Sequence, residues 1–142
     1  MATASYRLDR RLHPIPSLLL GSSLALLLGA LLSDWAYAES FQVQWINFAS
    51  WLIAGALVFT GITLLWAVID ALRADAPRGP GKWVYVGFVA ATFVIGFINA
   101  LVHAKDAWAT MPAGLILSMI VFLLALAATW AGFSGPKTGD MR

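Results

Sequence analysis

Few residues of this chain could take part in chemistry, and most of them stand at the ends of long apolar runs. Asp34, Asn99, His103 and Asp106 are predicted to gather at one rim of a helical bundle. Asn99 and His103 are four residues apart and therefore share a helix face. Together these groups could bind a proton, a cation or a quinone headgroup. The alternative is interfacial anchoring with a hydrogen bond between helices, because the groups are expected near water.

A second candidate cluster, at the opposite rim, consists of His13, Asp70 and Arg73. Arg73 follows Asp70 by three residues, so a local ion pair of little energetic worth is the alternative. The two histidines are expected to lie about 30 Å apart, the thickness of a bilayer core. The chain has no cysteine. We therefore expect no bound metal and no cofactor.

Hydroxyl side chains supply the polar groups that are placed more deeply in the apolar runs. Such side chains can bond to the backbone of their own helix. We expect no histidine at their depth, so the sequence predicts no catalytic nucleophile and a protein that is not an enzyme. These residues are Ser22, Ser23, Thr60, Thr63 and Ser118.

The elements that must position these groups are four apolar runs. Of 142 residues, 61% are hydrophobic and only 11% are charged. A helix of about 20 residues spans the hydrocarbon core of a bilayer. The runs predict spans at 16–38, 44–70, 83–103 and 112–133, joined by short loops. The chain is thus predicted to be one all-α transmembrane domain (1–142), a polytopic four-helix bundle without nucleic-acid binding or a soluble catalytic domain.

The basic residues predict the orientation of this bundle. Eight of the nine lie in the two tails and the second loop, and Lys105 alone lies in the third loop. Basic residues collect on the cytoplasmic side, so both termini are predicted to be cytoplasmic and the Asp34 rim to face outward. As an alternative, Arg10-Arg11, the run 18–32 and 36–38 resemble a cleavable signal peptide. Its removal would leave three helices, with an outer N-terminus.

Small residues recur at every fourth position along two of the predicted spans. Such stripes let helix backbones approach closely within a membrane. They predict contacts inside one four-helix bundle, with a seam between two copies of the chain as the alternative. The stripes are Gly21, Ala25, Gly29 and Ser33 in the first span, and Thr92, Gly96, Ala100 and Ala104 in the third.

Short segments in a fixed order resemble a known family. His13-Pro14 leads into the first span, which Asp34 closes; Asp70 closes the second, and Thr129-Trp130-Ala131-Gly132 the fourth. From about Leu12 to Phe133 the chain is similar to an uncharacterised family of small four-helix bacterial inner-membrane proteins that open with His-Pro. The resemblance implies that His13, Pro14, Asp34 and Asp70 match the family's polar landmarks. Members often carry a histidine early in the third span, where this chain has none after Trp83.

Some members of that family are associated with quinoprotein sugar-dehydrogenase genes. The resemblance therefore implies a non-catalytic accessory or anchor subunit of a membrane-associated redox enzyme, such as a dehydrogenase, in the inner membrane of a bacterium. One alternative is a small oligomeric transporter or a proton- or ion-conducting protein. Another is an electron-transfer protein that binds quinone or haem. The lipid bilayer is the expected surrounding in each case, and a homo-oligomer is compatible with all of them.

Overall fold

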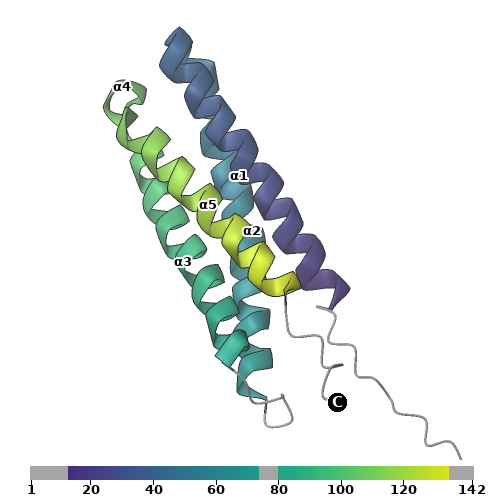
Figure 1. Cartoon of the computed structure of the whole chain (residues 1–142). Helices are drawn as coiled ribbons and strands as arrows, with labels where there is room; N and C mark the ends of the chain where they lie inside the picture. Colours follow the sequence, from purple (N-terminus) through teal and green to yellow (C-terminus); the bar gives the residue numbers. More distant parts are fainter. Residues whose placement is uncertain (1–12, 74–79, 135–142) are drawn as a thin grey trace, which may run out of the picture.

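A computed structural model of the chain describes residues 13–73 and 80–134. Within these ranges all regular structure is helical, and no strand is formed. Four of the helices are long and apolar enough to cross a membrane, while α4 is a single turn between two of them (Figure 1). The helices are α1 (Pro14–Ser40), α2 (Val43–Leu72), α3 (Pro80–His103), α4 (Ala107–Thr110) and α5 (Ala113–Phe133).

Both ends of α1 are defined by specific residues. His13 is the N-cap, and its Nδ1 accepts a hydrogen bond from the backbone N–H of Ile15 at 3.5 Å. Pro14 occupies the first helical position, where a missing N–H costs nothing. At the other end, Phe41 adopts a left-handed conformation with φ 54° and donates its N–H to the carbonyl of Tyr37. The helix therefore extends two residues beyond the apolar run at each end.

The other helices depart from the expected spans by one to three residues. α2 runs over 43–72 rather than 44–70, α3 over 80–103 rather than 83–103, and α5 over 113–133 rather than 112–133. The differences fall where polar residues or proline end the apolar pattern. Pro80 opens α3, for example, because proline favours the first turn of a helix. The helix α4 was not predicted, since one turn has too few residues for a periodic pattern.

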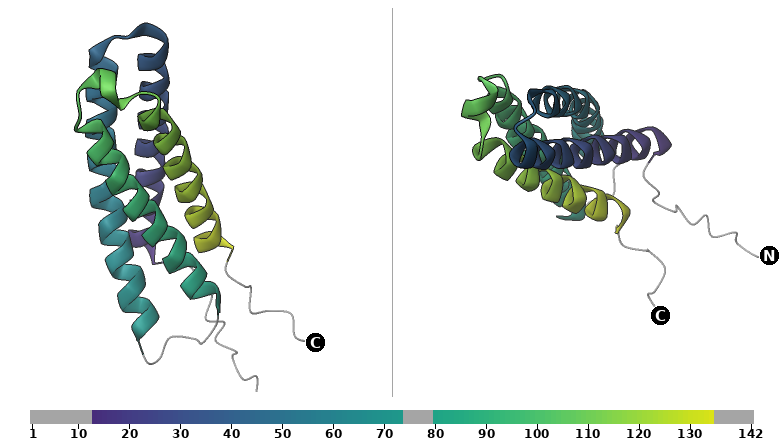
Figure 2. Two further views of the ribbon diagram at one scale, coloured as in Figure 1. Left: turned by 90° about the vertical axis from the view of Figure 1, so that its left-hand side faces the viewer. Right: turned by 90° about the horizontal axis from the view of Figure 1, so that it is seen from above.

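The four long helices form a bundle in which α1 and α3 are diagonal neighbours. α1 packs along α2 and α5, and α3 also packs along α2 and α5 (Figure 2). The end that holds α4 and the turn between α1 and α2 is called the α4 end below. The opposite end, where α1 begins and α5 ends, is called the termini end (Figure 1). A bond between α1 and α3 must therefore cross the middle of the bundle.

The interior away from the α4 end combines small and aliphatic side chains with buried hydroxyl side chains, such as those of Ser23 and Thr60. One buried cluster comprises Leu27, Ala56, Val121 and Ala125. A second cluster, nearer the termini end, comprises Leu20, Val89 and Ala128. Small side chains let the helices approach closely, which favours association in lipid.

The two stripes of small residues have different surroundings. A Cβ added at Gly96 of α3 would lie 3.1 Å from Leu57 and 3.6 Å from Val121, so three helices meet there. Gly21 of α1 is exposed, and nothing would lie within 4 Å of its added Cβ. Ala25 is exposed as well. Thr92 and Gly96 of the α3 stripe thus pack inside the bundle, while Ala104 at its end is exposed, and this half of the α1 stripe faces outward.

Candidate functional site

Asp34 is the centre of a buried polar site at the α4 end. Its side chain is completely buried, although six residues of α1 follow it. Its Oδ1 lies 2.8 Å from Nε2 of His103 on α3. Its Oδ2 accepts a hydrogen bond from the Oγ hydroxyl of Ser118 on α5. The carboxylate therefore joins three helices, and its bond to α3 crosses the diagonal of the bundle.

Two further hydrogen bonds close these contacts into a ring. The Nδ2 amide of Asn99 donates to Oγ of Ser118 at 2.9 Å. The Nδ1 atom of His103 lies 3.0 Å from the backbone carbonyl oxygen of Asn99, one turn earlier on α3. Asp34, Asn99, His103 and Ser118 are called the polar ring below. All four are buried, and His103 is the most exposed of them at 7%.

The hydrogen positions in the polar ring follow from its partners. A backbone carbonyl can only accept, so Nδ1 of His103 carries a hydrogen and donates it to Asn99. The Ser118 hydroxyl accepts a hydrogen bond from Asn99 and donates its own hydrogen to Asp34. The remaining contact, between Nε2 of His103 and Oδ1 of Asp34, needs one proton between two lone pairs. Either an imidazolium faces a carboxylate, or a neutral imidazole accepts from a carboxylic acid.

The amide of Asn99 is fixed in one orientation by this arrangement. If its oxygen faced Ser118, the serine hydroxyl would donate to Asn99, and Oδ2 of Asp34 would lose its donor. With Nδ2 on Ser118, the Oδ1 atom of Asn99 is buried and has no hydrogen-bond partner. Unsatisfied buried acceptors are uncommon in folded proteins. Within the polar ring, the Oδ1 atom of Asn99 is the one side-chain oxygen that receives no hydrogen bond.

The short helix α4 and the start of α5 cover the His103 ring. A Cβ added at Gly114 would lie 3.0 Å from Cε1 of His103 and 2.6 Å from Cγ2 of Thr110. Thr110 is buried, and its hydroxyl donates to the carbonyl oxygens of Val102 and Asp106. Only glycine at position 114 lets α5 approach this closely. The imidazole is thereby shielded at the α4 end by a single helical turn.

Comparison with known proteins places the chain in a family. The family described as "Predicted membrane protein (DUF2231)" matches residues 12–135. The chain belongs to this family. The expected resemblance to an uncharacterised family of membrane proteins is confirmed, and the family description assigns no activity. No curated protein and no solved structure matches the chain.

In this DUF2231 protein, the polar ring contains three of the four residues expected at the Asp34 rim. Asp34, Asn99 and His103 are members of the ring. Asp106 is not: it is exposed at the N-cap of α4, where its backbone carbonyl accepts from Ala109 and Thr110. The three were expected near water, yet they are buried, because α1 continues past Asp34 and α4 covers His103.

Ser118 is the member of the polar ring that sequence reasoning missed. The expectation that no histidine lies at its depth is wrong, since Ser118 and His103 bond to the same carboxylate. Distance from the helix ends could have predicted that the two residues lie at a similar depth in the membrane. Ser118 is five residues after Ala113 begins α5, and His103 ends the preceding long helix. Two consecutive spans place such residues near the same end.

The three candidate residues at the termini end are exposed and do not form a comparable network. The ring of His13 lies 5.0 Å from that of Trp66, centre to centre. Asp70 and Arg73 are exposed at the end of α2. Within the described ranges, no hydrogen bond or ion pair joins His13, Asp70 and Arg73 to one another. Lys82 instead donates to the carbonyl of Ala71 at 2.9 Å, where it satisfies the last turn of α2.

The polar ring does not have the geometry of a nucleophile and its base. In a serine-based catalytic triad, the histidine accepts the serine hydrogen and the carboxylate orients the histidine. Here Ser118 and His103 both bond to Asp34, and they are not hydrogen-bonded to each other. Among the described residues, no group of three or more side chains suited to holding a metal ion is found.

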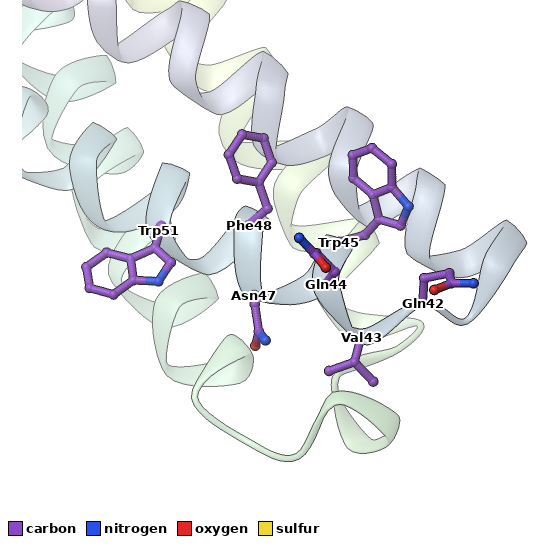
Figure 3. A pocket seen from close by; sticks show the side chains of 7 residues that line it. All are labelled: Gln42, Val43, Gln44, Trp45, Asn47, Phe48 and Trp51. Atoms are coloured by element: carbon purple, nitrogen blue, oxygen red, sulfur yellow. The ribbon is translucent and has the colours of Figure 1, made fainter.

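A shallow hollow lies on the outward side of α2 at the α4 end. Figure 3 shows Trp45 and Phe48 on one side of the helix, with Val43 and Asn47 pointing away from them. Trp51 lies one turn further along and is 78% exposed. Indole and amide groups suit the interface between lipid and water, because each combines an apolar body with a hydrogen-bonding group. Gln42 and Gln44 complete the lining.

Proposed function

We propose that this protein acts by association, as a non-catalytic accessory or anchor subunit of a redox enzyme in the inner membrane of a bacterium. The observation that carries the proposal is that the polar side chains of the ring are engaged in hydrogen bonds inside the bundle: the hydroxyl and the imidazole both bond to the carboxylate. No activated nucleophile remains among them. The redox part comes from the family resemblance, through dehydrogenase genes near some members.

The hollow on α2 is our proposed contact surface for the partner. Trp51 and Asn47 there are exposed, and they offer an indole and an amide one helical turn apart on α2. Trp130 on α5 is equally exposed, at 77% against 78% for Trp51, but it lines a hollow that is otherwise apolar. Aromatic residues with a polar group are enriched at the centres of protein interfaces. Trp130 is thus a matched control of the same residue type and exposure.

The test is capture of partners from native membranes, combined with site-specific photo-cross-linking. A cross-linking amino acid replaces Trp51 in one variant and Trp130 in the other. We expect a subunit of a membrane-associated dehydrogenase to co-purify reproducibly and to cross-link at position 51 only. Equal cross-linking at both positions would contradict the contact surface. Absence of any reproducible partner would contradict the accessory role.

A second candidate function is proton or ion conduction, and the Asp34–His103 pair is the observation that favours it. Ionisable side chains inside a membrane commonly mark ion or proton pathways. Against it, Leu27, Val121 and Ala125 form an apolar layer on the termini side of the polar ring. Proteoliposomes with an entrapped pH indicator separate the candidates. Flux that Asp34→Asn abolishes, with no partner captured, would favour conduction over association.

The orientation with both termini in the cytoplasm is part of the same proposal. The chain contains no cysteine, so single cysteines can be introduced without background. A cysteine at Gln42 should react with an impermeant thiol reagent added outside the cell. One at Gly81, whose added Cβ would meet nothing within 4 Å, should not react until the membrane is opened. The reverse pattern would overturn the orientation.

A further inference from the structure

The polar ring has a fixed proton count. The backbone carbonyl of Asn99 places a hydrogen on Nδ1 of His103, and the amide of Asn99 directs the hydroxyl of Ser118 toward Asp34. Only the 2.8 Å contact between Nε2 of His103 and Oδ1 of Asp34 can gain or lose a proton without reversing another bond. With one proton in this contact, the pair is neutral overall, whichever atom holds the proton.

Loss of that proton leaves a carboxylate whose charge has no counterpart. The lone pairs of Nε2 and Oδ1 would then face each other at hydrogen-bond distance, and a single negative charge would remain in a buried site. A buried charge without a partner is costly in a protein interior and more so in a membrane. The ring in its observed geometry is therefore the proton-bound form of the pair.

The neighbouring elements supply no charge that could replace the proton. On α1, Tyr37 lies one turn beyond Asp34, and Glu39 is exposed. Between α3 and α4, Lys105 and Asp106 are also exposed. α5 has no ionisable side chain, and the sole one of α2 is Asp70 at the termini end. Among the residues that the structure describes, Asp34 and His103 thus compensate only each other.

We propose that Asp34 and His103 form a binding site for one exchangeable proton, and that this bound proton holds α1 to α3 across the diagonal of the bundle. On release, the bond from the proton to Nε2 or Oδ1 breaks, and water at the α4 end accepts the proton. The contacts of Thr110 and Gly114 over the imidazole must loosen for this exchange. The lone carboxylate that remains then separates from His103, and α1 and α3 lose their polar connection.

Asp34→Asn tests whether the shared proton can be released, and it keeps the hydrogen bonds of the ring. An amide at position 34 can donate from its nitrogen to Nε2 of a neutral His103 and accept from Ser118 at its oxygen. Every contact of the ring is kept, while no group is left that can release the shared proton. The matched control is Asp106→Asn, which changes an exposed carboxylate at the same end of the bundle and outside the ring.

The experiment uses the full chain in lipid nanodiscs with ¹⁵N-labelled histidine, from pH 5 to pH 10. The chain has two histidines, so His13→Asn, which keeps an N-cap residue, assigns both sets of signals. Nitrogen shifts report a proton on Nε2 of His103. The infrared carboxylic-acid band that Asp34→Asn removes reports a proton on Asp34. Amide hydrogen exchange at the end of α3, divided into the intrinsic rate at each pH to give a protection factor, reports whether the helices separate.

We expect one of these two proton signals in the wild-type chain at low pH and neither at high pH. The protection factor of the amides at the end of α3, which compares the observed exchange rate with the intrinsic rate at each pH, should fall at least tenfold over the same range. In Asp34→Asn, Nε2 should carry no proton and the protection factor should not vary with pH, whereas Asp106→Asn should behave as wild type. A proton that stays bound up to pH 10, a pair that holds none at pH 5, or a wild-type response in Asp34→Asn would overturn the proposal. The measurement uses the isolated chain, so its outcome is independent of partner capture.

Discussion

Buried polar residues at the α4 end and in the middle of the bundle use their hydrogen bonds in different ways. In the middle, the hydroxyls of Thr60, Thr63 and Thr92 each donate to the carbonyl four residues earlier in their own helix. At the α4 end, Asp34 shares a hydrogen bond with His103 on α3 and accepts one from Ser118 on α5. The bonds in the middle satisfy each threonine within its own helix, and Ser23 of α1 adds longer bonds to Ala56 and Thr60 of α2. The arrangement at the α4 end joins three helices.

The cause of this difference is side-chain chemistry. A serine or threonine hydroxyl can reach the carbonyl of the preceding turn, so it needs no partner on another helix. A carboxylate accepts only, and the N–H groups inside a helix are already used by its backbone. When ionised, Asp34 can therefore be satisfied only by donors from other helices. A single buried acid thus determines which helices must pack together, whereas a buried hydroxyl that bonds within its own helix does not determine the neighbouring helix.

Removal of the acid should have the largest effect on stability. Asp34→Ala leaves Nε2 of His103 and the hydroxyl of Ser118 without their shared hydrogen-bond partner. An unsatisfied buried group costs about 1–3 kcal/mol, so we expect a loss of about 3 kcal/mol in the free energy of unfolding. Reversible unfolding in mixed detergent micelles measures it. A loss no larger than that of Asp106→Ala would show that the polar ring does not join the helices.

The close approach of α5 to His103 is the next most sensitive feature. Gly114→Ala places a Cβ 2.6 Å from Thr110 and 3.0 Å from the imidazole, and overpacking of this kind costs about 2 kcal/mol. Gly87→Ala on α3 is the control, because nothing lies within 4 Å of its added Cβ. Alanine there should be neutral or slightly stabilising. Thermal midpoints of the two variants in the same detergent compare them, and equal midpoints would refute the close contact.

Ser118→Ala should have an intermediate effect. The substitution removes the donor to Asp34 and the acceptor for Asn99, but it leaves the Asp34–His103 contact in place. Hydrogen bonds between helices in membrane proteins contribute up to about 1.7 kcal/mol, and we expect a loss close to that value. A double-mutant cycle with Asn99→Ala should give a coupling energy above zero. Additive losses would mean that the two side chains act independently.

Ser23→Ala, in the middle of the bundle, should have the smallest effect. Ser23 donates to the carbonyl of Ala56 at 3.3 Å and accepts from Thr60, whose hydroxyl also bonds to its own helix. Since Thr60 keeps a partner, the cost should be near the average of about 0.6 kcal/mol for membrane hydrogen bonds. The same unfolding measurement applies. A loss as large as that of Ser118→Ala would remove the distinction between the two regions.

Several features of this protein follow from the sequence alone. Four apolar runs of spanning length predict four helices, because a peptide backbone in lipid must satisfy its own hydrogen bonds. Asp34, Asn99 and His103 were predicted as one cluster from residue type and from distance to the ends of the runs. These quantities are local, or depend only on position along one helix. They need no knowledge of how the helices pack.

The tertiary structure decided which side of each helix faces which neighbour. Successive residues differ by about 100° around a helix axis, so depth in the membrane does not define direction. Ser118 therefore joins the polar ring while Asp106 does not, and Gly21 faces outward while Gly96 packs inside. The burial of Asp34 likewise depends on α3 and α5 closing around it. Helix rotation is set by the packing of all four helices at once, and no single segment of the sequence contains it.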